Sequence, residues 1–409
     1  MSKLKIVHLN TSGVGGAAIA CHRLHDLMLQ QGIQSNVIHL YDNCRRKSGC
    51  HSIGYSGMRR YTNRLLYTFA QYDLKPEAYV FNEMAPLACG VAHHPLVQEA
   101  DVIYLHWVQG GFLSKSDFEE IASLGKPVFC FTHDMWWITG ACHHVFDCEA
   151  YKTGCKQCPL HKRFSFLTRK QAAWKRSYYA KYRNVHLISP SVWLKSCADV
   201  SFVVDPERCH VISNVVPDAI FHLIDKQFAK KELGLPLDKI IISFGTADNH
   251  NVVKGFTYLQ QALNQIKDSR ILLCVYGSDY DEELASKIHH PIHFLGRLND
   301  PHQVALANAA ADLFVSPTLA ESFGLTLLEN IKCGTPVIST RTTAVPEIVK
   351  EGQTGYLVPP KDAKAIADAI VAFMNKPWHI THDCDEFFSD QFIIAQHLSL
   401  IEQVQNQNL

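Results

Sequence analysis

Short apolar runs recur along the chain and alternate with stretches of helical or irregular character. In each half the runs have the length and composition of buried parallel strands. The first half contains KLKIVHLN (3–10), SNVIHLY (35–41), DVIYLHWV (101–108), PVFCFTH (127–133) and NVHLISPS (184–191), and the second contains IIISFGT (240–246), ILLCVYG (271–277), IHFLG (292–296), LFVSP (313–317) and PVIST (336–340). The pattern predicts an α/β protein with two doubly wound, Rossmann-like sheets.

The length and the distribution of prolines indicate where the chain divides. A chain of 409 residues is too long for one ordinary core, and the mixed stretch 190–235 is punctuated by proline. We therefore expect an N-terminal Rossmann-like domain over 1–195 and a C-terminal Rossmann-like domain over 196–384. A C-terminal amphipathic helix over 385–405 is a candidate to pack back on the first domain. If the two domains face each other, the C-terminal ends of both sheets meet at a cleft, where ligands bind.

Composition excludes several classes of protein. Hydrophobic residues make up 47% of the chain and charged residues 19%, which is not typical of disorder. Lys plus Arg equals Asp plus Glu at 39 each, so the global charge does not indicate a nucleic-acid-binding protein. Polar residues interrupt the N-terminal segment, and no apolar stretch of roughly 18 residues occurs, so we expect a cytoplasmic protein.

The segment SPTLAESFGLTLLENIKCGTPVIST (316–340) carries the strongest chemical signal. A strand ends at Ser316, and a helix follows Ser322-Phe323-Gly324; the free amides at its start favour a diphosphate. Glu329, about two turns into this helix, presents a carboxylate that can accept from two ribose hydroxyls, and Glu321 lies in the loop before it. Two isolated glutamates would be more simply explained as a helix-terminal charge and a solvated side chain. The complete context favours a nucleotide site.

At these residues the second half resembles the retaining family-4 glycosyltransferases of the two-domain GT-B fold. In the first half, LHWVQGGFLS (105–114) and THDMWWITGACHHVFDCEAYKTGCKQCP (132–159) are similar to a subgroup that builds bacterial surface polysaccharides, including enzymes of colanic-acid type. The resemblance covers nearly the whole chain. It implies a hexosyltransferase that uses a nucleotide-sugar donor and requires no cofactor for catalysis.

The resemblance also implies roles for the residues around the glutamate pair. Glu329 is expected to bind the nucleotide ribose and Glu321 to contact the donor sugar. The backbone amides of Phe323, Gly324 and Leu325 are expected to face the sugar and the diphosphate.

The family further has an Arg and a Lys that neutralise the diphosphate. The Lys matches Lys254, which precedes a glycine, although by itself Lys254 would be a surface lysine. Thr246 and Ala247 stand where the Arg is expected, so neutralisation is left to Lys254 and helix amides, or to a basic residue that the sequence does not identify.

Two features of the first half are expected to reach the substrate. Gly15 and Gly16 follow the first strand, where they form either a tight turn or a loop that approaches a phosphate closely. His133 ends a strand, and the resemblance implies that it contacts the donor sugar; a structural histidine is the alternative. His106 is a weaker candidate on the same argument. Asp134 either orients His133 or caps the next helix.

Four cysteines cluster at Cys142, Cys148, Cys155 and Cys158. Four thiolates can close a tetrahedral zinc site, and the last two have the usual C-x-x-C spacing. The other spacings are longer than usual, so four free thiols in a packed loop are the alternative. In either case we expect the cluster to shape the acceptor side rather than to do chemistry.

Residues 161–183 are basic, contain no acid, and interleave Trp174, Tyr178, Tyr179 and Tyr182. Such a helix can lie on an anionic membrane with its aromatic rings at headgroup level, or it can pack those rings on the sheet. The first interpretation would suit a polyprenyl-diphosphate-linked acceptor and a peripheral contact with the inner membrane.

The sequence therefore predicts a retaining glycosyltransferase of surface polysaccharide biosynthesis (exopolysaccharide, O-antigen or other lipopolysaccharide). Its candidate catalytic residues are His133, Lys254 and Glu321, and its partners are a nucleotide sugar and a glycan or lipid-linked acceptor. The alternatives are a nucleotide-sugar epimerase or phosphorylase of the same fold, a non-catalytic zinc-stabilised binding protein, and a nicotinamide oxidoreductase.

Overall fold

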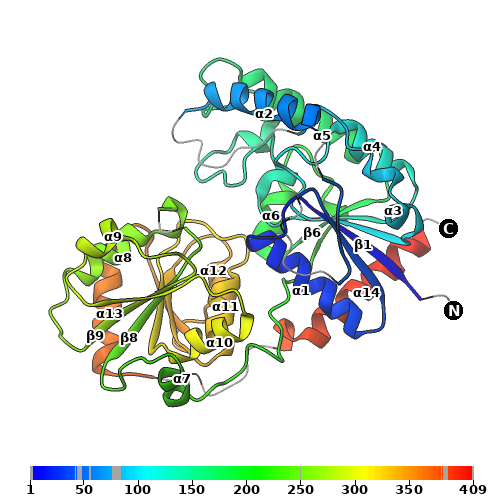
Figure 1. Cartoon of the computed structure of the whole chain (residues 1–409). Helices are drawn as coiled ribbons and strands as arrows, with labels where there is room; N and C mark the ends of the chain where they lie inside the picture. The colour runs from blue at the N-terminus through cyan, green and yellow to red at the C-terminus, as the bar shows by residue number, and fades with distance from the viewer. Residues whose placement is uncertain are drawn as a thin grey trace. The chain divides into compact units, whose positions relative to one another are not determined.

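The computed structural model describes residues 3–41, 43, 48–54, 57–75, 84–248, 250–378, 380 and 386–407. The chain forms two compact units (Figure 1). Unit 1 consists of Met1–Val215 and Gln391–Leu409, and unit 2 of Val216–Asp390. Within the described ranges, no helix combines the length and the apolar character needed to cross a membrane.

Unit 1 is built on a parallel sheet of 7 strands in the order β3-β2-β1-β4-β5-β6-β7. The order reverses between β1 and β4, which are neighbours in the sheet. The strands are β1 (Lys5–Asn10), β2 (Gln34–His39), β3 (Cys50–Ser52), β4 (Val102–Leu105), β5 (Val128–Phe131), β6 (Val185–Ser189) and β7 (Cys209–Val211).

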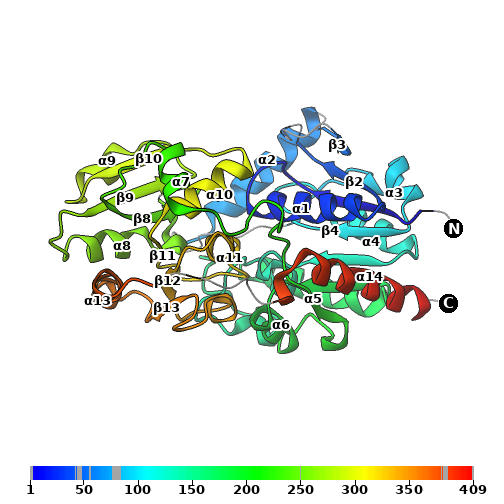
Figure 2. The same cartoon turned by 90° about the horizontal axis from the view of Figure 1, so that it is seen from below.

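Helices cover both faces of this sheet because alternate side chains of buried parallel strands point to opposite sides. On one face, Ile6, Tyr104 and Phe129 pack with helices α1 (Gly16–Gln30) and α14 (Asp390–Gln407). Figure 2 shows α14, in red, within the unit that holds the N-terminal strands. The other helices of the unit are α2 (Gly57–Tyr72), α3 (Pro95–Glu99), α4 (Lys115–Ser123), α5 (Ser165–Lys181) and α6 (Val192–Asp199), and the 3-10 turns are η1 (Val91–His93), η2 (Met135–Ile138), η3 (Ala150–Thr153) and η4 (Pro206–Arg208).

Unit 2 is built on a second parallel sheet, of 6 strands, in the order β10-β9-β8-β11-β12-β13. Here the order reverses between β8 and β11. The strands are β8 (Ile240–Gly245), β9 (Ile271–Tyr276), β10 (Ile292–Gly296), β11 (Leu313–Ser316), β12 (Val337–Thr340) and β13 (Gly355–Val358).

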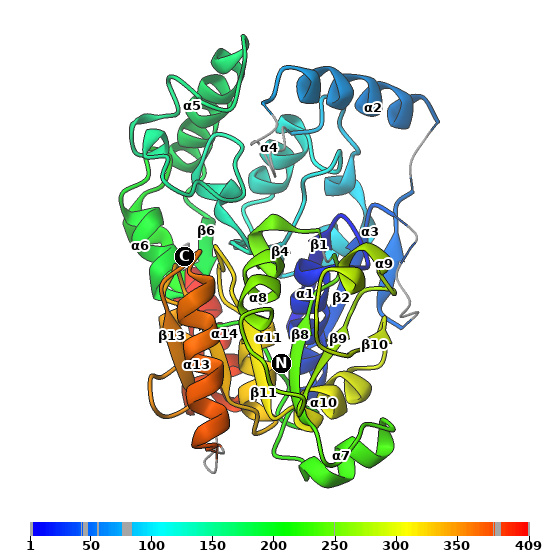
Figure 3. The ribbon, with the colours of Figure 1, turned by 90° about the vertical axis from the view of Figure 1, so that its left-hand side faces the viewer.

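Two hydrophobic clusters hold the helices of unit 2 on the two faces of its sheet. Helices α8 (Phe256–Leu263) and α13 (Ala363–Asn375) pack against each other on one face (Figure 3). Helices α7 (Lys226–Glu232), α10 (Pro301–Ala310) and α11 (Leu325–Lys332) belong to the other. The remaining short elements are η5 (Val252–Lys254), α9 (Glu282–Ser286), α12 (Val345–Ile348) and η6 (Glu386–Phe388).

The end of unit 1 differs from the boundary expected at residue 195. Strand β7 pairs in parallel with β6, through Leu187 and Cys209 among other positions. Residues 196–215 therefore belong to unit 1 and not to unit 2. The cause is a short edge strand that the apolar pattern does not reveal.

The interpretation of residues 161–183 as a helix with its rings at a membrane surface is wrong for two of its tyrosines. Tyr178 and Tyr179 of α5 are 3% and 2% exposed and belong to the main core of unit 1. Lys175 is also buried on this side, where its Nζ donates to the carbonyl oxygens of Trp136 and Thr139 and lies 3.5 Å from the ring centroid of Trp136. The helix thus uses one face to close the core and leaves its other basic residues exposed.

Burial lowers the pKa of Lys175 from its ordinary value to about 7. The unfolded chain holds this proton up to pH about 10.5, so folding releases it between these values and stability rises with pH in that window. Relative to Lys175→Met, we expect the wild type to gain about 1–3 kcal/mol between pH 7 and pH 9. Urea unfolding followed by tryptophan fluorescence measures this difference. Lys170→Met, an exposed change on the same helix, should track the wild type, and a Lys175→Met curve parallel to the wild type would contradict the shift.

Candidate functional site

The candidate site of unit 2 lies at the C-terminal ends of its two central strands. β8 leads into the loop that contains Lys254, and β11 leads into the loop that contains Glu321. These strands are neighbours at the point where the strand order reverses. In open α/β sheets the connections diverge at such a point and leave a crevice in which ligands bind.

Lys254 and Glu321 form an ion pair at this edge. Lys254 Nζ lies 2.7 Å from Glu321 Oε1, and the two side chains are 32% and 13% exposed. The sequence assigned both residues to the donor site, and the structure brings them together although they are far apart along the chain. A partly exposed ammonium beside a largely buried carboxylate can bind both an anionic group and a hydroxyl.

The loop that carries Lys254 is pressed against the end of β11. The carbonyl oxygen of Val253 accepts from the amide of Leu319 at 2.7 Å and from Thr318 Oγ1 at 3.0 Å. Gly255 has a φ of +69°, and a Cβ there would lie 1.9 Å from the carbonyl oxygen of Pro317. Only glycine permits this approach, which sets the position of Lys254 relative to the loop of Glu321.

A turn after β12 forms two hydrogen bonds with the backbone of Glu321, and the sequence did not predict this contact. The amide of Glu321 donates to Thr343 Oγ1 at 2.8 Å, and the amide of Ala344 donates to the carbonyl oxygen of Glu321 at 3.3 Å. Thr343 adopts a φ of +46°, a conformation that costs a β-branched residue energy and that is often found at functional sites. Thr343 is therefore a further candidate for positioning Glu321.

Helix α11 presents its N-terminus beside this pair. Gly324 is the N-cap, with a φ of +106°, and Leu325 is the first helical residue. Phe323 is 3% exposed and stacks edge-on against Phe388, so its side chain belongs to the core and only its backbone can serve a ligand. Glu329 lies on α11 and is 5% exposed. The helix thus offers free amides for an anion and a second, more deeply placed carboxylate.

Thr246 stands where the resemblance places an Arg, and its hydrogen bonds stabilise its own loop. The amide of Thr246 donates to the carbonyl oxygen of Tyr276 at 3.1 Å, and its Oγ1 donates to the carbonyl oxygen of Asp248 at 3.0 Å. Two arginines that follow other strands are paired elsewhere: Arg297 contacts Asp279, and Arg341 contacts Glu351. Neither arginine therefore stands in for the second cation that the resemblance implies beside Lys254.

In unit 1 the glycine-bearing loop follows β1 and begins α1. Gly15 is the N-cap of α1 with a φ of +100°, and no atom lies within 4 Å of a Cβ placed on Gly15 or on Gly16. The loop is thus open on its outer side. The amides of Gly13 and Val14 already donate to Asn43 Oδ1 at 2.7 Å and to Ser12 Oγ at 3.2 Å, so the amides of Gly15 and Gly16 are the ones that can serve a ligand at the carboxyl end of β1.

His133 follows β5 and is joined to His106, which follows β4. Nδ1 of His106 lies 2.8 Å from Nε2 of His133, and the rings stack with centroids 5.1 Å apart. Asp134 caps η2 by accepting from the amide of Trp136 at 2.8 Å, and its other oxygen lies 2.5 Å from Nδ1 of His143. Of the two roles expected for Asp134, the structure therefore shows the cap, and His106 rather than Asp134 contacts His133.

The four clustered cysteines line one small cavity of about 60 Å³, whose wall includes Tyr151 and Leu160. Burial raises the pKa of the Cys155 thiol to about 11 and raises that of Cys142 further, which favours neutral thiols. Among the described residues, the groups whose potential ligand atoms all lie within 4.8 Å of one another are His8–Cys21–His106 and His22–His39–Cys50, and the four clustered cysteines do not form such a group. In each group two histidine nitrogens already lie 3.0 Å apart, a hydrogen-bond distance.

Comparisons with known proteins relate part of the chain to a known family. A family model described as glycosyl transferases group 1 matches residues 238–376. The putative colanic acid biosynthesis glycosyl transferase WcaC of Escherichia coli K12 is 25% identical over 358 residues, which cover 82% of this chain and 83% of that protein. Phosphatidyl-myo-inositol mannosyltransferase of Mycobacterium leprae is 33% identical over 146 residues, which cover 34% of this chain and only 38% of the relative.

Among solved structures, HepE of Anabaena in complex with UDP and glucose superposes with a TM-score of 0.62 over 99% of both chains at 17% identity. This likeness concerns the fold and confirms the predicted α/β, GT-B class with two Rossmann-like domains. The expected family resemblance is confirmed by the match over residues 238–376. Unit 2 therefore carries a domain of the glycosyl transferases group 1 family, within a chain of GT-B fold.

Proposed function

We propose that this protein is a retaining glycosyltransferase that moves a sugar from a nucleotide-sugar donor to a glycan or lipid-linked acceptor in bacterial surface polysaccharide biosynthesis. The observation that carries this proposal is the Lys254–Glu321 ion pair at the strand-order reversal of unit 2. Similarity to WcaC over most of the chain supports the substrate class.

The residues of unit 2 suit the departure of a nucleoside diphosphate. Lys254 and the amides at the start of α11 stabilise the negative charge that develops on the leaving phosphate. Glu321 accepts from hydroxyls of the donor sugar, and Glu329 accepts from those of the ribose. The leaving phosphate takes the proton of the acceptor hydroxyl as that hydroxyl joins the same face of the anomeric carbon. The two glutamates therefore position the donor and do not act as an acid and base pair.

An epimerase or phosphorylase of the same fold would use the same donor contacts. The distinction lies in the products: an epimerase converts the donor without an acceptor, and a phosphorylase requires inorganic phosphate. Incubating the donor alone, with phosphate, and with lipid-linked acceptors separates the three activities.

Two finer features belong to the proposal. A patch of exposed basic residues around α5 suits the headgroups of an anionic inner-membrane surface, and consists of Lys162, Arg163, Arg169, Lys170, Arg176, Lys181 and Arg183. The four cysteines around the small cavity are candidates for a structural zinc site that shapes unit 1. Metal analysis of the purified protein and vesicle sedimentation test these two features separately.

The donor site is tested by ligand-induced thermal stabilisation of the whole chain with UDP-, GDP-, ADP- and dTDP-sugars. A ligand at 100 times its Kd stabilises the folded state by about 2.7 kcal/mol, so one nucleotide class should raise the Tm by a few degrees. Glu329→Gln keeps the shape of the side chain and should abolish most of that shift. Glu282→Gln, an exposed change on α9, should retain it. Equal stabilisation of Glu329→Gln and the wild type would remove Glu329 from the site.

A further inference from the structure

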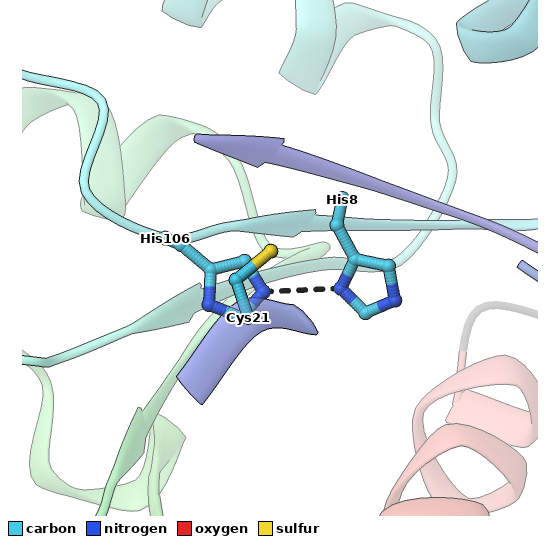
Figure 4. Close-up of side chains that lie close together, drawn as sticks. All are labelled: His8, Cys21 and His106. Atoms are coloured by element: carbon cyan, nitrogen blue, oxygen red, sulfur yellow. Dashed lines mark hydrogen bonds between the residues drawn. The ribbon is translucent and has the colours of Figure 1, made fainter. Parts of the chain in front are cut away.

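Three histidines form a continuous chain through the sheet of unit 1. His8 lies on β1, and His106 and His133 follow the neighbouring strands β4 and β5, on the face that α1 and α14 cover. His133 Nε2 lies 2.8 Å from His106 Nδ1, and His106 Nε2 lies 3.0 Å from His8 Nδ1. Figure 4 shows the inner contact, with Cys21 of α1 beside it. The chain leads from the carboxyl edge of the sheet into its core.

Burial and aromatic neighbours disfavour a charge on the two inner rings, those of His8 and His106. His8 and His106 are 0% exposed, and they stack on Tyr104 and Phe131 respectively. Burial lowers the pKa of His133 to about 4, and the pKa values of His106 and His8 well below the ordinary value. At neutral pH each ring therefore carries one proton, on one nitrogen only.

The inner end of the chain decides where those protons lie. Nε2 of His8 is buried and has no hydrogen-bond partner among the described residues. A buried N–H without an acceptor is costlier and rarer than a bare acceptor nitrogen, so the proton of His8 lies on Nδ1. His8 then donates to Nε2 of His106, and His106 must carry its own proton on Nδ1 and donate to Nε2 of His133. The position of the proton on His8 thus determines which nitrogen of His133 carries its proton.

We propose that His106 and His8 are positioning residues that hold His133 as the Nδ1–H tautomer, so that His133 presents a hydrogen-bond donor at the carboxyl edge of β5. Within the described residues no hydrogen bond is recorded for this nitrogen, and His133 is partly exposed. It would therefore take a ligand through an acceptor atom, a hydroxyl or phosphoryl oxygen, and would not receive a proton from it. The identity of that ligand as a sugar substrate rests on the proposed function; the tautomer does not.

Long-range ¹H–¹⁵N NMR of the full chain tests the tautomer directly, because protonated and bare ring nitrogens resonate far apart. We expect His133 to show a protonated Nδ1 and a bare Nε2 at pH 7. His106→Phe keeps an aromatic ring in the stack and should leave His133 as a mixture of tautomers. The matched control is His397→Phe. His397 is as buried as His106, and its Nδ1 lies at a hydrogen-bond distance of 3.0 Å from the Tyr104 hydroxyl, but it is not one of the three linked histidines. The spectrum of this control should retain the wild-type signals of His133.

Three outcomes would overturn the proposal: a bare Nδ1 on His133 in the wild type, an unchanged single tautomer in His106→Phe, or tight binding of Zn²⁺ or Co²⁺ that shifts the His8 and His106 signals. The last would identify the group with Cys21 as a metal site. If the protein transfers a sugar, His106→Phe should also raise KM about 3- to 10-fold with a smaller change in kcat. Absence of transfer in the wild type would contradict the proposed function and leave the NMR result standing.

Discussion

Replacing Lys254 with Met should lower kcat/KM for sugar transfer by about 10²–10³-fold, because it removes the cation that faces charge developing on the leaving diphosphate. Met retains most of the apolar stem of Lys254, so packing changes little. Glu321 would also lose its partner at 2.7 Å and remain largely buried as a carboxylate. Steady-state kinetics with the donor identified by thermal stabilisation measures the loss.

Two further variants make the Lys254 result interpretable. Lys287→Met removes an exposed lysine of unit 2 that pairs with Glu283, and should leave kcat/KM within about twofold of the wild type. Glu321→Gln combined with Lys254→Met should cost much less than the product of the two single effects, since the residues act as a unit. Fully additive losses, or a Lys254→Met enzyme as active as Lys287→Met, would show that the pair does not hold the donor.

Replacing Gly255 with Ala should destabilise unit 2 by about 3 kcal/mol or more, because the new Cβ cannot coexist with the carbonyl oxygen of Pro317 1.9 Å away. Gly234→Ala is a close control: Gly234 also has a positive φ, +64°, but no atom lies within 4 Å of its Cβ position. That change should cost about 1 kcal/mol from backbone strain alone. Differential scanning calorimetry measures both. Equal Tm losses would mean that the loop of Lys254 is not pressed against β11.

The apolar pattern predicted the sheet edge on which the candidate site of unit 2 lies, whereas the choice of Lys254 came from the family resemblance. The apolar runs at 240–246 and 313–317 became the central strands β8 and β11, so residues after them had to emerge at one edge. This is why Lys254 and Glu321 meet. Thr343 escaped prediction because a β-branched residue in sequence favours extended backbone, and only the fold shows its positive φ.

The buried face of helix α5 was present in the sequence as a helical pattern, but the pattern did not decide what the helix packs against. Gln171, Ala172, Lys175, Tyr178 and Tyr179 are all buried, at the spacing of one helical face. Lys175 stands in the middle of that face, and the sequence left open whether the helix lies on a membrane or packs its rings on the sheet. A lysine can be buried when backbone carbonyl oxygens accept from its Nζ, and sequence alone does not show where those carbonyls lie.

The histidine chain was only partly visible in the sequence. The sequence indicated His133 and His106 because each lies near the end of an apolar run, whereas His8 lies inside a strand and no role was predicted for it. The strand order β1-β4-β5 places the three side by side, and neither local propensity nor spacing along the chain contains that order.

Retaining sugar transfer is tested most directly by following the anomeric proton of the sugar by ¹H NMR during turnover of the full chain. The donor is the nucleotide sugar that stabilises the protein, and polyprenyl-diphosphate-linked glycans serve as acceptors. For a retaining glycosyltransferase we expect that the donor signal disappears, that nucleoside diphosphate accumulates in equal amount, and that a new glycoside appears with the anomeric configuration of the donor. A glycoside of inverted configuration, or a donor that binds but is never consumed with any acceptor, would contradict the proposed function.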